Sequence, residues 1–418
     1  MRMVNIILAL WLACLVSCSR SVPQTSDNLP QRGYVWQRDW TPAVIDSVLQ
    51  ASKVLNGIVV LGGEVEWQAQ QPHFSAATID WEVLRSHRMS CALALRIAPY
   101  DGPFAAEDGN SRFIVSTTKS LLSAAATHGV NINEFQLDFD CATKNLAGYK
   151  LWLRAIRKAV HPIPFVVTTL PAWLDDPEFV LLAREADRYV LQVHSVPVLQ
   201  SSGRSRLCDA ASARRWVSKA AGLKLPFSVA LPTYRCTAGY GASGKLLSVG
   251  MDGVQPAWPP NTRILEFEAS PDEMAMLIEE WRRERVPELT EVIWYRIPVA
   301  SDIRNWGWIT LSTVMSGRRP VHELVAMQEG SNPIDISIQN AGERDEQLEG
   351  SLVATWTGSA VLAGDGLRGW SVDITEQRAV FRTNNEYPTR LPPGKKRTIG
   401  WLRYDAPTAL RLQLTMNK

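Results

Sequence analysis

Two aspartates that could move a proton stand two residues apart within the stretch Glu134 to Cys141, where polar and bulky apolar side chains alternate. This alternation predicts a strand, because successive side chains of a strand point to opposite faces. Gln136, Asp138 and Asp140 would then share one face. Two carboxylates that face the same way repel each other when both are charged, which raises a pKa and favours acid–base chemistry.

The segments around this stretch alternate between strand and helix patterns, which indicates a parallel sheet covered by helices. A polar strand face inside such a sheet needs a partly wet interior. The (β/α)8 barrel provides one at the carboxyl ends of its strands, where Asp140 would lie. We therefore predict an α/β fold, a (β/α)8 TIM-like barrel over residues 33–315. Its eight strands are expected at Tyr34–Trp36, Ile58–Trp67, Ala92–Ala98, Glu134–Cys141, Phe165–Leu170, Tyr189–His194, Phe227–Leu231 and Val292–Ile297.

The same two-residue period places other polar and aromatic side chains at the strand ends that share the mouth of this barrel. The predicted binding residues are Trp36, Arg38, Gln192, His194, Tyr234, Trp294 and Arg296, and the predicted catalytic carboxylates are Asp138, Asp140, Glu64 and Glu66. Aromatic rings stack on the C–H faces of sugars, while amides and carboxylates bind hydroxyl groups. The predicted ligand is a glycan or another small polar molecule. A lone inward His or Gln is equally compatible with a core polar group, so the interpretation depends on the whole set.

The barrel segments resemble an uncharacterised bacterial family, domain of unknown function 3142, over roughly Tyr34 to Thr313. More distantly, the aspartate strand is similar to the DxxDxDxE strand of chitinase-like glycoside hydrolases. Asp138 and Asp140 match the second and third acids of that pattern. Phe135 stands at the first acid, and Ala142 stands where the catalytic Glu would be. The resemblance implies a hydrolase-like barrel and a substrate-stacking role for Trp294, the only other residue carried over.

Two functions remain open from the sequence. In the first, the barrel hydrolyses a glycan, with Asp140 as general acid, Asp138 beneath it, and Glu64 or Glu66 as a second carboxylate. In the second, the barrel has lost its acid at Ala142 and only binds glycans or an envelope partner.

The N-terminus has the pattern of an export signal. Arg2 is followed by the apolar run Ile6 to Val16 and by Leu15-Val-Ser-Cys18, a sequence that resembles a bacterial lipobox. We expect residues 1–17 to be a lipoprotein signal peptide, Cys18 to be lipidated, and residues 18–32 to form a tether. Because Ser19 rather than Asp follows Cys18, the expected location is the outer membrane of the cell envelope, facing the periplasm. The alternative is an ordinary cleaved signal peptide.

Four cysteines remain in the predicted mature chain after Cys18. Cys91 opens one predicted strand and Cys141 closes the next, so they would lie at opposite ends of the barrel, too far apart for a disulfide. Cys208 and Cys236 follow neighbouring strands on the same face. They are the best candidate pair for a disulfide, and two buried thiols are the alternative.

Several function classes find little support. A net charge of +2 gives no reason to expect nucleic acid as a partner. Gly239 to Lys245 fits the start of a phosphate-binding loop, but Leu246 stands where magnesium needs Ser or Thr, so we expect no nucleotide and instead a mobile loop over the mouth. The histidines outside the mouth are scattered, so neither a metal nor a cofactor is predicted.

The pattern changes beyond Thr313. From Ile334 onward the chain consists of short alternating runs separated by turns, which predicts an antiparallel, sandwich-like β domain over residues 330–418. Trp356, Trp370 and Trp401 are interpreted as core residues of this domain, with a ligand platform as the alternative.

Overall fold

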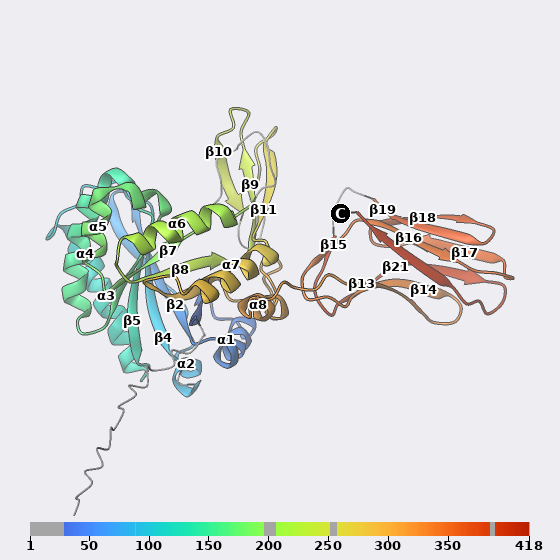
Figure 1. The fold of residues 1–418 in the computed structure, drawn as a ribbon, viewed down its shortest axis with the longest axis horizontal. Coiled ribbons are helices and arrows are strands. Elements are labelled where there is room, and N and C mark those ends of the chain that lie inside the picture. The colour runs from blue at the N-terminus through green and yellow to red at the C-terminus, as the bar shows by residue number, and fades with distance from the viewer. Residues whose placement is uncertain (1–28, 88, 196–205, 251–256, 385–388, 418) are drawn as a thin grey trace, which may run out of the picture.

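A closed barrel of eight parallel strands forms the first domain (Figure 1). The computed structural model describes residues 29–87, 89–195, 206–250, 257–384 and 389–417. The strands follow the order β1-β12-β8-β7-β6-β5-β4-β2, and β2 pairs back with β1. They are β1 (Gln31–Val35), β2 (Gly57–Gln68), β4 (Cys91–Ile97), β5 (Ile132–Phe139), β6 (Phe165–Thr169), β7 (Arg188–Gln192), β8 (Phe227–Pro232) and β12 (Leu289–Tyr295). The predicted α/β barrel is confirmed.

Each barrel strand is followed, directly or after an insertion, by a helix that packs on the outside. The helices are α1 (Pro42–Val54), α2 (Trp81–His87), α3 (Gly109–Thr127), α4 (Leu146–Val160), α5 (Pro177–Ala183), α6 (Ala210–Gly222), α7 (Pro271–Glu284) and α8 (Trp308–Met315). Caps fix several of their starts: the side chains of Asp108, Asp209 and Ser270 each accept a hydrogen bond from a first-turn amide.

The apolar face of each strand meets these helices. On β5, Phe135, Leu137 and Phe139 belong to the large core between barrel and helices, where Phe139 contacts the rings of Tyr149 and Trp152 from α4. The other face of β5 lies inside the barrel. The two-residue alternation read from the sequence therefore gives the correct orientation for this strand.

Two insertions extend the barrel. β3 (Gln71–Ala76) forms an antiparallel hairpin with the long strand β2. Between β8 and α7, β9 (Arg235–Tyr240), β10 (Leu246–Gly250) and β11 (Arg263–Glu268) form a small antiparallel sheet that projects from the barrel (Figure 1). The predicted mobile loop at Gly239–Lys245 is wrong in form, because this segment is the end of β9 and the turn into β10.

The second domain is built from two four-stranded antiparallel sheets that share one core. One sheet contains β13 (Leu324–Glu329), β14 (Ile334–Asn340), β21 (Lys396–Tyr404) and β17 (Val361–Gly366). The other contains β18 (Trp370–Thr375), β19 (Arg378–Thr383), β16 (Gly350–Thr355) and β22 (Arg411–Met416). A two-stranded ribbon, β15 (Glu346–Leu348) with β20 (Thr389–Leu391), completes the domain.

The second domain, called the sandwich below, begins earlier than the sequence indicates. Its first strand starts at Leu324, ahead of the predicted boundary at residue 330. Trp356 and Trp370 are buried in its core. Trp401 lies instead on an outer face, half-buried, with the guanidinium of Arg403 6.0 Å from its ring centre. The core role predicted for Trp401 is therefore wrong.

Candidate functional site

A cavity of about 260 Å³ opens at the carboxyl ends of the barrel strands, the end where barrel enzymes carry their active sites. We call it the mouth. Its lining consists of Tyr34, Trp36, Arg96, Asp138, Asp140, Thr168, Leu170, Gln192, His194, Ser195, Ala230, Tyr234 and Tyr295. Six residues predicted for the site, Trp36, Asp138, Asp140, Gln192, His194 and Tyr234, lie together here.

The two aspartates differ in their surroundings. Asp138 lies inside the cavity, where its Oδ1 accepts hydrogen bonds from Thr168 Oγ1 at 2.7 Å and from Gln192 Nε2 at 3.4 Å. Burial raises the pKa of Asp138 to about 6, and the negative charge of Asp140 adds to this. Asp140 is open to solvent at the rim, yet partial loss of water also raises its pKa, against the opposing charge of Arg96. Both shifts favour a proton on the pair at mildly acidic pH.

Aromatic rings form the opposite wall and meet around Tyr295. Its ring centre lies 5.5 Å from Trp36, 5.8 Å from Tyr34 and 5.6 Å from Tyr234. His194 stacks on Tyr295 at 5.4 Å with only 24° between the planes. The mouth thus combines a wall of rings with a carboxylate pair, a pattern suited to a ligand with apolar C–H faces and many hydroxyl groups.

His194 is a neutral group in this wall. Burial lowers its pKa to about 4, and its Nε2 has no hydrogen-bond partner among the described residues. Burying an imidazole nitrogen without a hydrogen-bond partner destabilises the folded protein, unless a ligand or a water molecule forms a hydrogen bond with it. This nitrogen is the polar atom of the mouth that most needs a ligand.

The carboxylates predicted on β2 lie outside the cavity. Glu64 sits at the rim, where it forms ion pairs with Arg38 at 2.6 Å and with Arg96 at 3.6 Å. Glu66 is farther along the β2–β3 hairpin, opposite His73, and accepts a hydrogen bond from Gln68. The inward position predicted for Glu66 is therefore wrong, because β2 runs beyond the barrel before Glu66 is reached. Arg38, largely exposed, reaches the mouth only through Glu64 and Arg96.

The prediction that Trp294 and Arg296 point into the barrel from the last strand is wrong. Trp294 is fully buried on the outer face of β12, where its indole donates to Gln31 and its ring faces Trp306. Arg296 is also buried outside the cavity, paired with Asp302 at 2.6 Å. Tyr295 takes the inward place instead. Glu291 is the only charged residue of β12, and its inward side chain marks the correct phase.

The predicted disulfide is absent from the structure. Cys91, Cys141, Cys208 and Cys236 are all free and buried. Cys208 packs into the core between barrel and helices, whereas Cys236 faces the separate core beneath the β9–β11 sheet. The two thiols follow neighbouring strands, as predicted, but they point into different cores.

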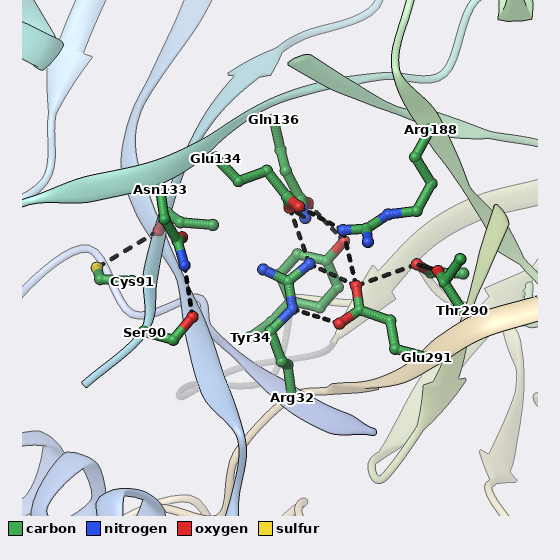
Figure 2. A network of polar contacts seen from close by, with 12 residues as sticks. Arg32, Tyr34, Ser90, Cys91, Asn133, Glu134, Gln136, Arg188, Thr290 and Glu291 are labelled. Atoms are coloured by element: carbon green, nitrogen blue, oxygen red, sulfur yellow. Dashed lines mark hydrogen bonds and ion pairs between the residues drawn. The ribbon is translucent and has the colours of Figure 1, made fainter. Parts of the chain in front are cut away.

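A second polar cluster lies at the opposite, closed end of the barrel interior, and the sequence analysis missed it (Figure 2). We call it the base network. Arg32 donates to Glu291 and to Glu134 (2.8 Å each), and Arg188 pairs with both carboxylates. The Nε2 of Gln136 donates to Glu134 at 2.7 Å, and its Oε1 accepts from the hydroxyl of Tyr34 at 2.8 Å. Two cations meet two anions, so this end of the barrel is neutral.

Two absences concern the described part of the chain. Within it, no group of three or more His, Cys, Asp or Glu side chains is placed to hold a metal ion. The same residues contain no helix of the length and apolarity needed to cross a membrane. The predicted lipidation site, Cys18, lies outside the described residues.

Residues 93–300, from β4 to the end of β12, match the model of a domain of unknown function (DUF3142). The barrel belongs to the DUF3142 family. This confirms the resemblance read from the sequence, although β1 and β2 precede the matched region of the DUF3142 barrel. Residues 323–405 of the sandwich match a second domain of unknown function (DUF8456). A search of curated proteins finds no significant match.

Solved structures similar to this chain include chitinases. Chitinase ChiA74 from Bacillus thuringiensis is 10% identical, with a TM-score of 0.46, and the alignment covers 93% of this chain and 100% of that one. A chitinase from Chromobacterium violaceum is 9% identical, with a TM-score of 0.47, covering 69% and 98%. The spore cortex-lytic enzyme SleL from Bacillus cereus is 8% identical, with a TM-score of 0.49, covering 69% and 74%. These are likenesses of overall architecture, and the chemistry of the DUF3142 mouth depends on its own side chains.

Proposed function

We propose that the mouth binds a glycan and hydrolyses it with acid catalysis by the Asp138–Asp140 pair. The observation that carries this proposal is the coexistence, in one cavity, of two carboxyl groups with raised pKa values and a wall of aromatic rings. Enzymes use raised carboxyl pKa values to keep a proton available near the working pH. The cavity of about 260 Å³ is near the lower end of ligand pockets, so it would hold a small part of a chain of sugars.

The residues take distinct roles in this proposal. Asp140, at the solvent rim, donates its proton to the leaving-group oxygen as the glycosidic C–O bond breaks, and a water molecule adds to the sugar carbon and returns a proton to Asp140. Asp138 keeps the pKa of the pair raised and is oriented by Thr168 and Gln192. Tyr295 and Trp36 stack against the sugar ring. Glu64 acts through its ion pair with Arg96 and does not touch the ligand itself.

The test is a glycan panel run on the wild type and on Asp140→Asn. The amide keeps the shape of the carboxyl but has no proton to donate as an acid, so turnover should fall about 10²- to 10⁴-fold while binding persists. Asp335→Asn, on an exposed position of β14 in the sandwich, is the matched control and should keep full activity. Cleavage by Asp140→Asn at the full rate would remove Asp140 from the mechanism.

A second function, binding without hydrolysis, is favoured by the site of Ala142. This residue begins the turn after β5, and the cavity contains no carboxylate besides Asp138 and Asp140 among the described residues. A module of this kind would cleave no member of the panel. Tyr295→Ala should then weaken its retention on one of those glycans, since stacking on this ring would supply much of the affinity. Unchanged retention would exclude the mouth as the binding surface.

The proposed place of action is the periplasmic face of the outer membrane, with the chain held to that membrane by a lipid on Cys18. The support is the lipobox pattern Leu15-Val-Ser-Cys18. Cys18→Ser should move the protein from the membrane fraction to the soluble fraction. An unchanged fractionation would contradict the anchor.

A further inference from the structure

One wall of the mouth is held in place by a single strand end. The amide of Ala269, directly after β11, donates to the carbonyl of Tyr234 at 3.1 Å. The carbonyl of Glu268 accepts from the amide of Leu207 at 3.2 Å, and the carbonyl of Leu207 accepts from the amide of Ser195 at 2.9 Å. Tyr234 and Ser195 both line the mouth. The segment Glu268–Ala269 is therefore the shared support of this wall, which also includes His194.

The sandwich contacts the same segment, Glu268–Ala269, through ion pairs. Arg390 of β20 pairs with Glu268 at 2.8 Å and with Glu266 at 2.7 Å. Arg235, the residue after Tyr234, pairs with Asp345 of the sandwich at 3.4 Å. We call these five residues the interdomain clamp. One pair holds the residue that follows Tyr234, and the other holds the strand end whose next amide, that of Ala269, bonds to the Tyr234 carbonyl.

The contact is close and partly shielded from water. A cavity of about 20 Å³, enough for little more than a single water, lies between the domains here, and Tyr234, Arg235, Glu268, Asp345 and Arg390 line it. Glu268, Asp345 and Arg390 also border a larger cavity of about 860 Å³ between the domains. Tyr234 thus forms a partition, with the mouth on one side and the interdomain contact on the other. The side chains of Arg235 and Asp345 are only 16% and 15% exposed, so solvent screens their attraction less than that of a surface pair.

We propose that the sandwich sets the shape of the mouth through this clamp, with Arg390 and Asp345 as positioning residues for Tyr234, His194 and Ser195. The sandwich then contributes to the structure of the site on the barrel. Other contacts keep the domains together when one arm of the clamp is removed, among them the pair Arg344–Asp272 at 2.7 Å. The inference concerns the geometry of the mouth and stands whether or not the mouth hydrolyses a glycan.

The test is hydrogen exchange on the full chain, comparing the wild type with Arg390→Ala. Because half-exposed ion pairs are individually weak, the expected effect is a rise of about 3- to 10-fold in the exchange rates of the Ser195, Leu207 and Ala269 amides. Amides of β4, on the far side of the barrel, should not change. Arg390→Lys, which keeps the charge and loses the planar fork, should give a smaller rise.

A second measurement reports on the side chains of the mouth. The chain contains six histidines, and labelled histidine allows each ring to be titrated by NMR, with the His194 signal assigned from His194→Gln. When the wall loosens, water reaches His194, so its pKa should rise from about 4 toward its ordinary value in Arg390→Ala and in Asp345→Asn. A role in stability alone would leave this titration in place.

Arg382→Ala is the matched control, because Arg382 is an exposed sandwich arginine paired with Asp373 within its own sheet. It should change neither the exchange rates nor the titration. Glu268→Gln removes the same ion pair from the barrel side and replaces Arg390→Ala should that variant fail to fold. Unchanged exchange at Ser195 and Ala269, or a rise spread evenly over the barrel, would overturn the proposal.

Discussion

The two ends of the barrel interior carry opposite solutions to the problem of buried charge. At the closed end, the two arginines and two glutamates of the base network satisfy one another. At the mouth, two aspartates share the cavity with a single arginine, and Asp140 has no ion pair among the described residues. One strand, β5, supplies Glu134 to the first cluster and Asp138 and Asp140 to the second. The paired charges of the base network stabilise the barrel. The mouth keeps an excess of negative charge that a ligand can meet.

The first prediction breaks the balanced end. Glu134→Ala leaves Arg32 and Arg188 facing only Glu291, so an uncompensated cation remains buried. We expect a loss of about 3–5 kcal/mol in the free energy of unfolding, measured by urea denaturation. Glu82→Ala removes an exposed ion pair to Arg85 and should cost less than about 0.5 kcal/mol. A loss below about 1 kcal/mol for Glu134→Ala would show that the base network does not hold the barrel.

The second prediction concerns the unbalanced end. Because the pKa of Asp138 is raised from 3.8 to about 6, the folded protein binds more protons than the unfolded chain between these pH values. This group therefore contributes about 3 kcal/mol of stability below pH 3.8, which is lost as the pH rises through 6. Asp138→Asn, which keeps an acceptor for Thr168, should raise the stability at pH 7 by up to that amount.

The measurement is urea denaturation from pH 4 to pH 7, with Asp335→Asn as the exposed control. The control should reproduce the wild-type curve at every pH. Lower stability of Asp138→Asn at pH 7, with an unchanged pH profile, would mean that burial of this carboxylate costs nothing.

The third prediction reverses the sign of the second. The pKa of His194 is lowered from 6.5 to about 4, so the folded protein binds fewer protons between these values and gains about 3 kcal/mol as the pH rises from 4 to 6.5. The two groups nearly cancel in the wild type. His194→Gln should expose the Asp138 slope, with stability falling as the pH rises from 4 to 6. His73→Gln, at an exposed position of β3, should reproduce the wild-type profile, and a wild-type profile for His194→Gln would contradict the assignment.

The smallest prediction concerns the hydrogen bond between the two ends. Tyr34→Phe leaves Oε1 of the fully buried Gln136 without its donor, at a cost of about 1–3 kcal/mol in the free energy of unfolding. Tyr149→Phe is the matched control, because its buried hydroxyl has no partner among the described residues. That change should be within about 0.5 kcal/mol of neutral. Equal effects of the two variants would show that the Tyr34–Gln136 hydrogen bond does not contribute to the free energy of unfolding.

The sequence predicted the mouth better than the base, for a physical reason. The period of two along β5 is local, so the common face of Gln136, Asp138 and Asp140 could be read directly. The base network joins residues on four strands, and nothing in the sequence says that Arg32 and Glu291, 259 positions apart, will meet. Both faces of β12 are largely apolar, so only Glu291 indicates which of its side chains point into the barrel. The prediction placed Trp294 inward, whereas Tyr295 is the inward residue.

The seam between β1 and β12 has a consequence for folding. β12 is the last barrel strand to leave the ribosome, and it brings Glu291, half of the negative charge in the base network. A chain that ends before β12 holds Arg32 and Arg188 against Glu134 only, with one positive charge in excess at the centre of an open sheet. Closing the barrel and neutralising the base network are thus a single late event of high contact order.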